Sequence, residues 1–353
     1  MNWILDMATR NVKRNKRRTA LAVASICLTV MLMTFLGGFV DGVLDNMVRN
    51  LTRNETGHVR ITTKGFETRA RFMPVDELIA DPGALVRAIE AIPGLPGGLV
   101  VASERLLFGT LLSNGPNTKA AVGLAGDARN ETGLINLDRS IVQGTYLAAP
   151  GEAILGAKLA RDLGFGVGDT LRVVTQGSDY GLHLKRFTVS GIFDTGLNQL
   201  DGSFFQVHLA DARALLRSGG ASQQLLVMLE DYRKADEAAE AIRHAIAALP
   251  GGDGLVVRSW TEIGDYPRMI GMMEGIYEWV FVVVAFLGAF IITNILMMVV
   301  LERRKEIGIL KAMGLRRRDV MAMFLAEGAL MGAIGSALGR SEERRVGKEC
   351  RSR

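Results

Sequence analysis

Residues that build catalytic and metal sites are scarce in this sequence. Its 353 residues include two cysteines and four histidines. The histidines are scattered, and neither a His-Glu-x-x-His nor a Cys-x-x-Cys pattern occurs. Such patterns supply the clustered ligands that zinc requires, so the sequence predicts no metal site. Cys27 lies in an apolar run and Cys350 in the tail, so we expect no disulfide in the region between them.

A phosphate-binding loop is also missing. The Gly-x-x-x-x-Gly-Lys-Ser/Thr pattern does not occur, and Gly164-x-Gly166-x-Gly168 lacks the strand-turn-helix context of a dinucleotide loop. Serine nucleophile signatures are absent as well. We therefore expect a chain that is not an enzyme and holds no cofactor, so that any nucleotide chemistry comes from another chain.

The sequence does contain long apolar runs. Apolar residues make up 48% of the chain but are unevenly spread, and the runs 19–40 and 279–301 carry no charge. Each exceeds the roughly 20 residues needed to cross about 30 Å of hydrocarbon. A third run, 320–339, contains one carboxylate, Glu327. The sequence predicts an α-helical membrane protein with transmembrane helices at 19–40, 274–301 and 319–339.

The third run carries two signs of helix packing. A carboxylate inside a span is costly, so Glu327 should lie near the cytoplasmic interface or face a neighbouring helix. Small residues at i, i+3 or i+4 allow another helix to approach closely. The run offers them at Gly328, Gly332, Gly335 and Gly339.

Basic residues flank the first two runs. Six lysines and arginines lie within 10–18, directly before the first run, and a second cluster directly follows the second run. Short basic loops stay on the cytoplasmic side, so the net charge of +5 reflects membrane topology rather than nucleic-acid binding. We predict an inner-membrane protein with a cytoplasmic amphipathic helix at 1–18 and a cytoplasmic loop at 302–318.

The region 41–273 has no further span, so it should form a domain across the membrane from the basic clusters. Alternating residues predict a strand at 57–63, and helical periodicity predicts a helix at 84–92. A strand-rich section covers about 99–208, and strands alternate with helices on either side of it. This order predicts an extracytoplasmic α+β domain that carries a β-rich insertion.

Two connections join this domain to the spans. Residues 41–56 could continue the first helix as a stalk. Ser259-Trp260-Thr261-Glu262 matches a capping box, so we expect a helix that runs from there into the second span, kinked near its start by Pro267. Such a helix could act as a lever or as a plain connector.

The loop 302–318 has the pattern of an amphipathic helix. Ile307, Leu310 and Gly314 follow at i, i+3 and i+7, and Ile309 and Met313 form an i, i+4 pair. Gly314 should end the helix, since glycine adopts left-handed backbone angles freely. The helix could be gripped by a soluble partner; the alternative is a basic loop that anchors to the membrane surface without a partner.

The stretch 302–314, followed by Phe324-Leu325-Ala326-Glu327-Gly328, resembles the signature of FtsX-like ABC transporter permeases, the MacB and lipoprotein-releasing (Lol-type) group. The runs 151–171 and 187–196 resemble blocks of that family's extracytoplasmic domain. The resemblance implies a porter-like α/β part with a small β insertion, a second permease copy or paralogue, and a cytosolic ATPase dimer that binds ATP and Mg²⁺. It also implies a coupling helix that docks on the ATPase through Glu306, Ile307, Leu310, Lys311, Ala312, Met313 and Gly314.

The substrate is predicted from a narrower resemblance. Residues 193–212 are more similar to the lipoprotein-releasing permeases than to the macrolide-efflux type, which implies lipoproteins as partners. An apolar groove at the outer leaflet could accept acyl chains, although ordinary helix packing explains the same residues. Efflux, or a signalling complex that controls a cell-wall hydrolase or sensor kinase, stays open. The groove residues are Val43, Leu44, Met47, Val48, Ile270, Met272 and Met273.

The sequence changes abruptly after Gly339. Residues 340–353 are strongly charged, whereas the resembling family continues with a turn and a fourth span. We expect a truncated or out-of-frame end with a tail foreign to the family.

Overall fold

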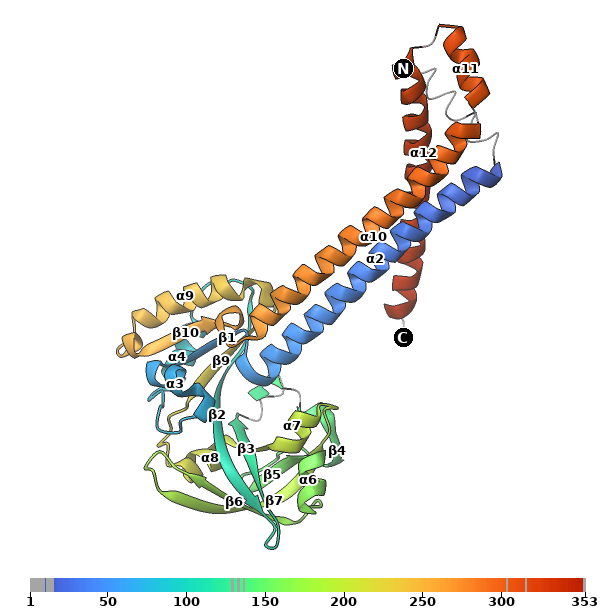
Figure 1. Cartoon of the computed structure of the whole chain (residues 1–353). Coiled ribbons are helices and arrows are strands. Elements are labelled where there is room, and N and C mark those ends of the chain that lie inside the picture. Colours follow the sequence, from blue (N-terminus) through green and yellow to red (C-terminus); the bar gives the residue numbers. More distant parts are fainter. Residues whose placement is uncertain are drawn as a thin grey trace. The chain divides into compact units, whose positions relative to one another are not determined.

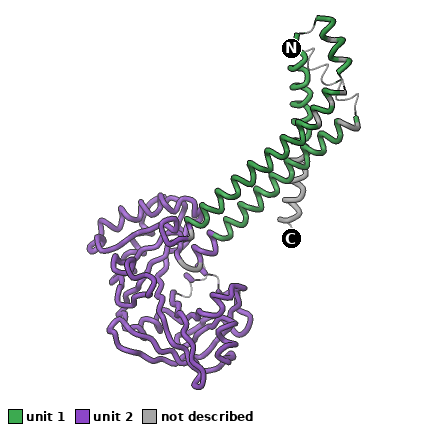
Figure 2. The backbone as a smooth tube through the Cα atoms, in the orientation of Figure 1, with its two compact units in different colours: residues 1–47, 268–353 green, residues 48–267 purple. Residues whose placement is uncertain are grey.

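The structure is a computed structural model that describes residues 10, 16–127, 130–131, 134–135, 137–302, 304–314 and 316–351. Contacts divide the chain into two compact units (Figure 2). The first comprises 1–47 and 268–353, and the second comprises 48–267. The amphipathic helix predicted at 1–18 lies almost wholly outside the described residues.

The first unit is built from helices (Figure 1). They are α2 (Lys16–Leu51), α10 (Tyr266–Glu302), α11 (Arg304–Ala312) and α12 (Arg317–Arg351). In the described part of the chain, three helical stretches are long and apolar enough to cross a membrane: Thr19–Leu51, Pro267–Asn294 and Arg317–Leu338. The three membrane helices expected from the sequence are thereby confirmed as helices.

Close approaches hold α2 and α10 side by side in opposite directions. A Cβ added at Gly288 would lie 2.6 Å from Thr29 Cγ2, and one at Gly37 would lie 3.7 Å from the Phe281 ring. Both contacts lie along the middle of the helices, and a side chain at Gly288 would require Thr29 of α2 to move.

Helix α12 packs on α2 through one of its predicted glycines. Ile26 is buried with Met331, and a Cβ added at Gly335 would lie 2.7 Å from Ile26 Cγ2. Gly332 has no atom within 4 Å of its added Cβ, so it takes no part in this contact. Glu327 is only 4% exposed, which fits the expectation that it faces neighbouring helices.

The second unit contains one ten-stranded sheet whose strand order is β10-β1-β9-β2-β3-β8-β5-β7-β4, with β6 pairing β2 and β7. At one end, β10 (Leu255–Ser259), β1 (Val59–Thr63) and β9 (Gln224–Leu229) form the α/β part. Apolar faces of α4 (Pro82–Glu90) and α9 (Ala235–Ala247) pack on these strands around Val59, Ile61 and Val227. A short helix, α3 (Lys64–Arg69), follows β1.

The β-rich section closes into a six-stranded barrel, because β6 pairs with β7 on one side and returns to β2 on the other. Closure leaves no strand edge between these six neighbours. The strands in ring order are β2 (Leu99–Ser113), β3 (Thr118–Gly126), β8 (Phe204–His208), β5 (Glu152–Gly156), β7 (Leu182–Phe193) and β6 (Thr170–Gln176).

An apolar core fills the barrel. Leu106, Phe108, Leu155, Val189 and Phe205 point into it and have 0% exposure. The strand β4 (Ile141–Gly144) adds to β7, and this section also contains α6 (Ala157–Leu163), α7 (Asn198–Ser203) and α8 (Leu209–Leu216). The expected β-rich insertion is therefore present.

Strand β2 joins the two parts, which the sequence did not reveal. Its first half pairs with β9 and its second half with β3, and Arg105 stands where the partners overlap, opposite both Gln224 and Gly126. The Arg105 guanidinium, fully buried, donates to Glu131 Oε2 at 2.9 Å. The insertion thus shares one continuous strand with the α/β part and is not joined to it by loops alone.

The capping box predicted at Ser259 is wrong. Ser259 makes no side-chain cap; its hydroxyl instead donates to the carboxylate of Asp236. Only a 3₁₀ turn forms over Trp260–Glu262, and extended angles at Ile263 end it before α10 begins at Tyr266. Pro267 is therefore the second residue of α10, where proline needs no backbone donor and makes no kink.

Candidate functional site

The cytoplasmic loop expected at 302–318 contains α11. The Met313 amide donates to the Ile309 carbonyl at 3.0 Å, so the helical pattern continues one residue past Ala312. The Gly314 amide donates to Lys311 O at 3.1 Å, and Gly314 has a φ of 95°. The prediction that Gly314 ends the helix is confirmed. A Cβ there would meet no atom within 4 Å, so backbone angle rather than space requires glycine.

Helix α12 begins directly after this turn. Asp319, in its first turn, accepts a hydrogen bond from the Arg316 amide at 3.2 Å, which caps the helix. Arg316, Arg317 and Arg318 are exposed. Positive charges at a helix N-terminus oppose the helix dipole, so the local fold gains nothing from them.

Side chains of the predicted docking positions differ in exposure. Lys311, Ala312, Met313 and Gly314 are exposed, and Met313 is 73% exposed. Ile307 is half-buried. The side chains of Glu306 and Leu310 lie outside the described part. Ile309, which was not among the predicted positions, is 61% exposed; its i, i+4 spacing to Met313 was the available signal.

The residues predicted to line a lipid groove also differ among themselves. Met272 is 64% exposed. Val48 and Ile270 are buried, at 4% and 6% exposure. Val43, Leu44, Met47 and Met273 are half-buried. The groove itself stays a prediction.

A polar cluster fastens the point where the chain passes from α2 into the sheet. The chain leaves α2 through a π-helical turn over Thr52–Thr56 and then Gly57, whose φ is 65°. The next residue, His58, is buried, and its Nδ1 accepts a hydrogen bond of 2.8 Å from the Leu229 amide. Its carbonyl accepts from the Trp260 amide at 3.0 Å. Burial, assisted by nearby Arg53, lowers the pKa of His58 to about 4, so the ring is neutral. One residue thus ties together the starts or ends of β1, β9 and β10.

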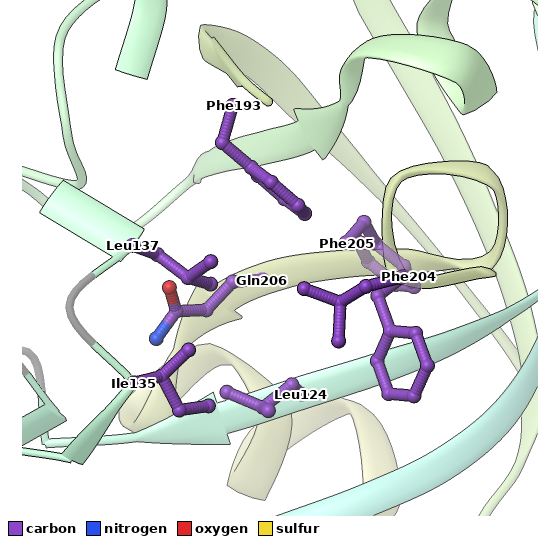
Figure 3. A pocket seen from close by; sticks show the side chains of 8 residues that line it. Leu124, Ile135, Leu137, Phe193, Phe204, Phe205 and Gln206 are labelled. Carbon is purple, nitrogen blue, oxygen red and sulfur yellow. The ribbon is translucent and has the colours of Figure 1, made fainter. Parts of the chain in front are cut away.

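A small apolar cavity of about 10 Å³, which has room for about one water molecule, lies on the outer side of the barrel, within a separate apolar cluster around Leu137 and Phe193 (Figure 3). Gln206 is its one polar side chain. The others are Leu124, Ile135, Leu137, Phe193, Leu200, Phe204 and Phe205. The cavity is too small for an acyl chain. Within the described residues, no group of three or more His, Cys, Asp or Glu side chains could hold a metal ion.

The helices and the sheet domain define a class of protein: a membrane protein with a large folded domain inserted between its first two apolar helices. Residues 19–245 match the family model of the MacB-like periplasmic core domain, and residues 279–340 match that of the FtsX-like permease C-terminal. Because the first match covers more than half of the chain, the chain belongs to the family of FtsX-like ABC transporter permeases with a MacB-like periplasmic core. The resemblance found in the sequence is thereby confirmed.

Curated relatives come from two branches. The lipoprotein-releasing system transmembrane protein LolC of Xylella fastidiosa is 32% identical over 198 residues, which are 54% of this chain and 46% of that protein. The macrolide export ATP-binding/permease protein MacB of Nitrobacter winogradskyi is 26% identical over 194 residues, 53% of this chain and 29% of that protein. The chain spans no more than about half the length of these relatives.

The crystal structure of the periplasmic region of MacB from Actinobacillus actinomycetemcomitans aligns with a TM-score of 0.42 at 12% identity, covering 60% of this chain and 92% of that one.

Proposed function

We propose that this chain is the permease subunit of an ABC transporter whose ATP is hydrolysed by a separate cytosolic ATPase dimer. The observation that carries the proposal is the helix α11, which ends at a left-handed Gly314 and leaves Ile309 and Met313 exposed. Exposed apolar side chains on a short helix between two membrane-length helices are typical of a surface that a partner covers.

The proposed mechanism is mechanical. The ATPase dimer binds α11 differently in its ATP-bound and ATP-free states, because only a difference in affinity can shift the permease between two conformations. The shift alters how α2, α10 and α12 pack, and the domain 48–267, proposed to lie outside the membrane, responds. A second permease copy or paralogue completes the complex, with the N-terminus in the cytoplasm.

We propose lipoprotein release as the work performed. The support is that LolC proteins are among the relatives and share about a third of matched residues with this chain. MacB proteins are also relatives, so macrolide-type efflux is the second candidate. A signalling complex that drives a cell-wall hydrolase or sensor kinase is the third.

Affinity purification of the protein from its own membranes in mild detergent, followed by mass spectrometry, separates these functions. An ABC ATPase together with acylated lipoproteins is the expected result. An ATPase with a periplasmic adaptor would favour efflux, and an ATPase with a hydrolase or kinase would favour signalling. Recovery of no ATPase would contradict the proposed function itself.

A further inference from the structure

Three residues other than glycine have left-handed backbone angles in the described part of the chain. They are Met73, Tyr180 and Arg217, with φ of 48°, 61° and 57°. Such angles are costly for a residue that carries a Cβ, and they persist only where the surrounding contacts hold the backbone in place. The three residues are far apart in sequence, yet hydrogen bonds connect the segments that contain them. The strained backbone is therefore gathered at one seam of the sheet domain.

One side of the seam is the segment 73–79, which we call the strap. The carbonyls of Met73 and Pro74 accept hydrogen bonds from Gln223 Nε2, at 3.4 and 2.8 Å. The other end of the same side chain, Gln223 Oε1, accepts from the Leu107 amide of β2 at 2.6 Å. Gln223 has 0% exposure, so water cannot replace these partners. The strap is thus fixed to β2 by a buried side chain.

The other side of the seam is the tip of the β6–β7 hairpin, residues 177–181. The Ser178 amide donates to the Leu216 carbonyl, and the Ser178 hydroxyl donates to the Arg217 carbonyl, both at 2.8 Å. These two bonds join the first part of the tip to the end of α8.

Among the described residues, one hydrogen bond joins the tip to the strap. The Tyr180 hydroxyl donates to Asp76 Oδ2 at 3.1 Å, and Tyr180 is 69% exposed. A hydrogen bond from Arg69 holds the pKa of Asp76 below its usual range, so the acceptor stays ionised. Water competes directly for an exposed hydrogen bond, so this link breaks more readily than the buried bonds of Gln223.

We propose that Tyr180 and Asp76 form a latch between the hairpin tip and the strap. When their hydrogen bond is made, the tip lies against the strap; when it breaks, the tip moves away while the barrel stays folded. The left-handed angle at Tyr180 favours release, since a freed tip can return to unstrained angles. The strap keeps its place in both states because Gln223 fixes it to β2. The latch belongs to the domain itself and does not depend on the transport function proposed above.

Hydrogen exchange of the full chain in detergent, measured by mass spectrometry, tests the latch. Tyr180→Phe removes only the hydroxyl, so amide exchange in the tip should become about threefold faster, as expected for the loss of one hydrogen bond. Exchange in the strap should not change. Tyr277→Phe, the matched control in α10, should leave both segments as they are.

Asp76→Ala should also speed exchange in the tip. Adding Tyr180→Phe to Asp76→Ala should then change the rate by less than about 1.5-fold, because both substitutions remove the same bond.

Three results would overturn the latch. Unchanged exchange of the tip in Tyr180→Phe would mean that the hydroxyl does not hold it. Multiplying effects in the double variant would mean that Tyr180 and Asp76 act separately. Faster exchange throughout the barrel would mean that the hydroxyl stabilises the whole fold and that the tip has no open state of its own.

Discussion

At the scale of single residues, the backbone angle of Gly314 sets the turn that follows the proposed ATPase-binding helix α11. Its φ of 95° belongs to a region that β-branched residues rarely adopt, and nothing surrounds its missing side chain. A substitution there changes the turn between α11 and α12 without disturbing any packed neighbour. A substitution at Gly314 can therefore test the proposed coupling separately from membrane insertion.

Gly314→Val should reduce ATP-driven activity at least about tenfold while insertion stays normal, because strain of about 1–2 kcal/mol shifts the end of α11. Gly314→Asn should retain most activity, since asparagine tolerates left-handed angles. ATP turnover of the purified complex and membrane fractionation measure the two effects. Equal activity of Gly314→Val and the unaltered chain would refute this role for the turn.

His58 predicts a pH dependence of stability. Its pKa of about 4 in the folded protein is below the ordinary value of 6.5 for histidine, so the unfolded chain binds more protons between these values. The contribution of about 3 kcal/mol is present above about pH 6.5 and is lost as the pH falls toward 4. Urea unfolding of the chain in detergent, followed by tryptophan fluorescence, should show this loss.

His58→Gln should be less stable than the unaltered chain near pH 7 and should flatten the pH dependence, since glutamine does not titrate. An equally steep acid-side loss in His58→Gln would assign the effect to other groups.

At the scale of elements, contacts between the membrane helices depend on single glycines. Gly288→Leu should separate α2 from α10 and cost about 1–3 kcal/mol, because its Cβ alone would lie 2.6 Å from Thr29. Gly271→Leu, on the same helix but with open space around it, should change stability by less than about 0.5 kcal/mol. Thermal unfolding in detergent compares the two. Similar losses for both variants would mean that the close approach at Gly288 does not decide the cost, since leucine itself has a higher helix propensity than glycine.

Local patterns predicted most elements of the domain. Strand β1 lies at Val59–Thr63, within the 57–63 that alternation predicted, and α4 lies at Pro82–Glu90, close to the predicted 84–92. Elements with weak periodicity, such as α3 and β4, were missed. The helix expected to begin at Ser259 does not form there. The Ser259 hydroxyl, which would have capped it, donates a hydrogen bond to Asp236 of another element instead.

The arrangement of the barrel could not be predicted from the sequence. Its closure depends on β6 reaching β2 some sixty residues away, and its junction depends on the buried pair of Arg105 and Glu131. Neither pairing leaves a local signal. The candidate site was predicted more fully, because residue spacing alone identified α11 and its end at Gly314. The structure was needed to show that Ile309 is exposed whereas Ile307 is half-buried.

At the scale of the whole molecule, the chain combines membrane helices with a domain of MacB-like type, and its proposed task is to connect them. The connection is made twice in sequence, at the end of α2 and at the start of α10. At the first, His58 holds three strands of the sheet together.

The central claim is that α11 is the contact with a cytosolic ATPase. Its most direct test is to place a photo-activated cross-linking amino acid at position 309, irradiate intact membranes, and identify the adduct by mass spectrometry. We expect an adduct with an ABC ATPase whose yield differs between ATP-bound and ATP-free conditions. An adduct with lipid alone, or with no ATPase in either condition, would contradict the account.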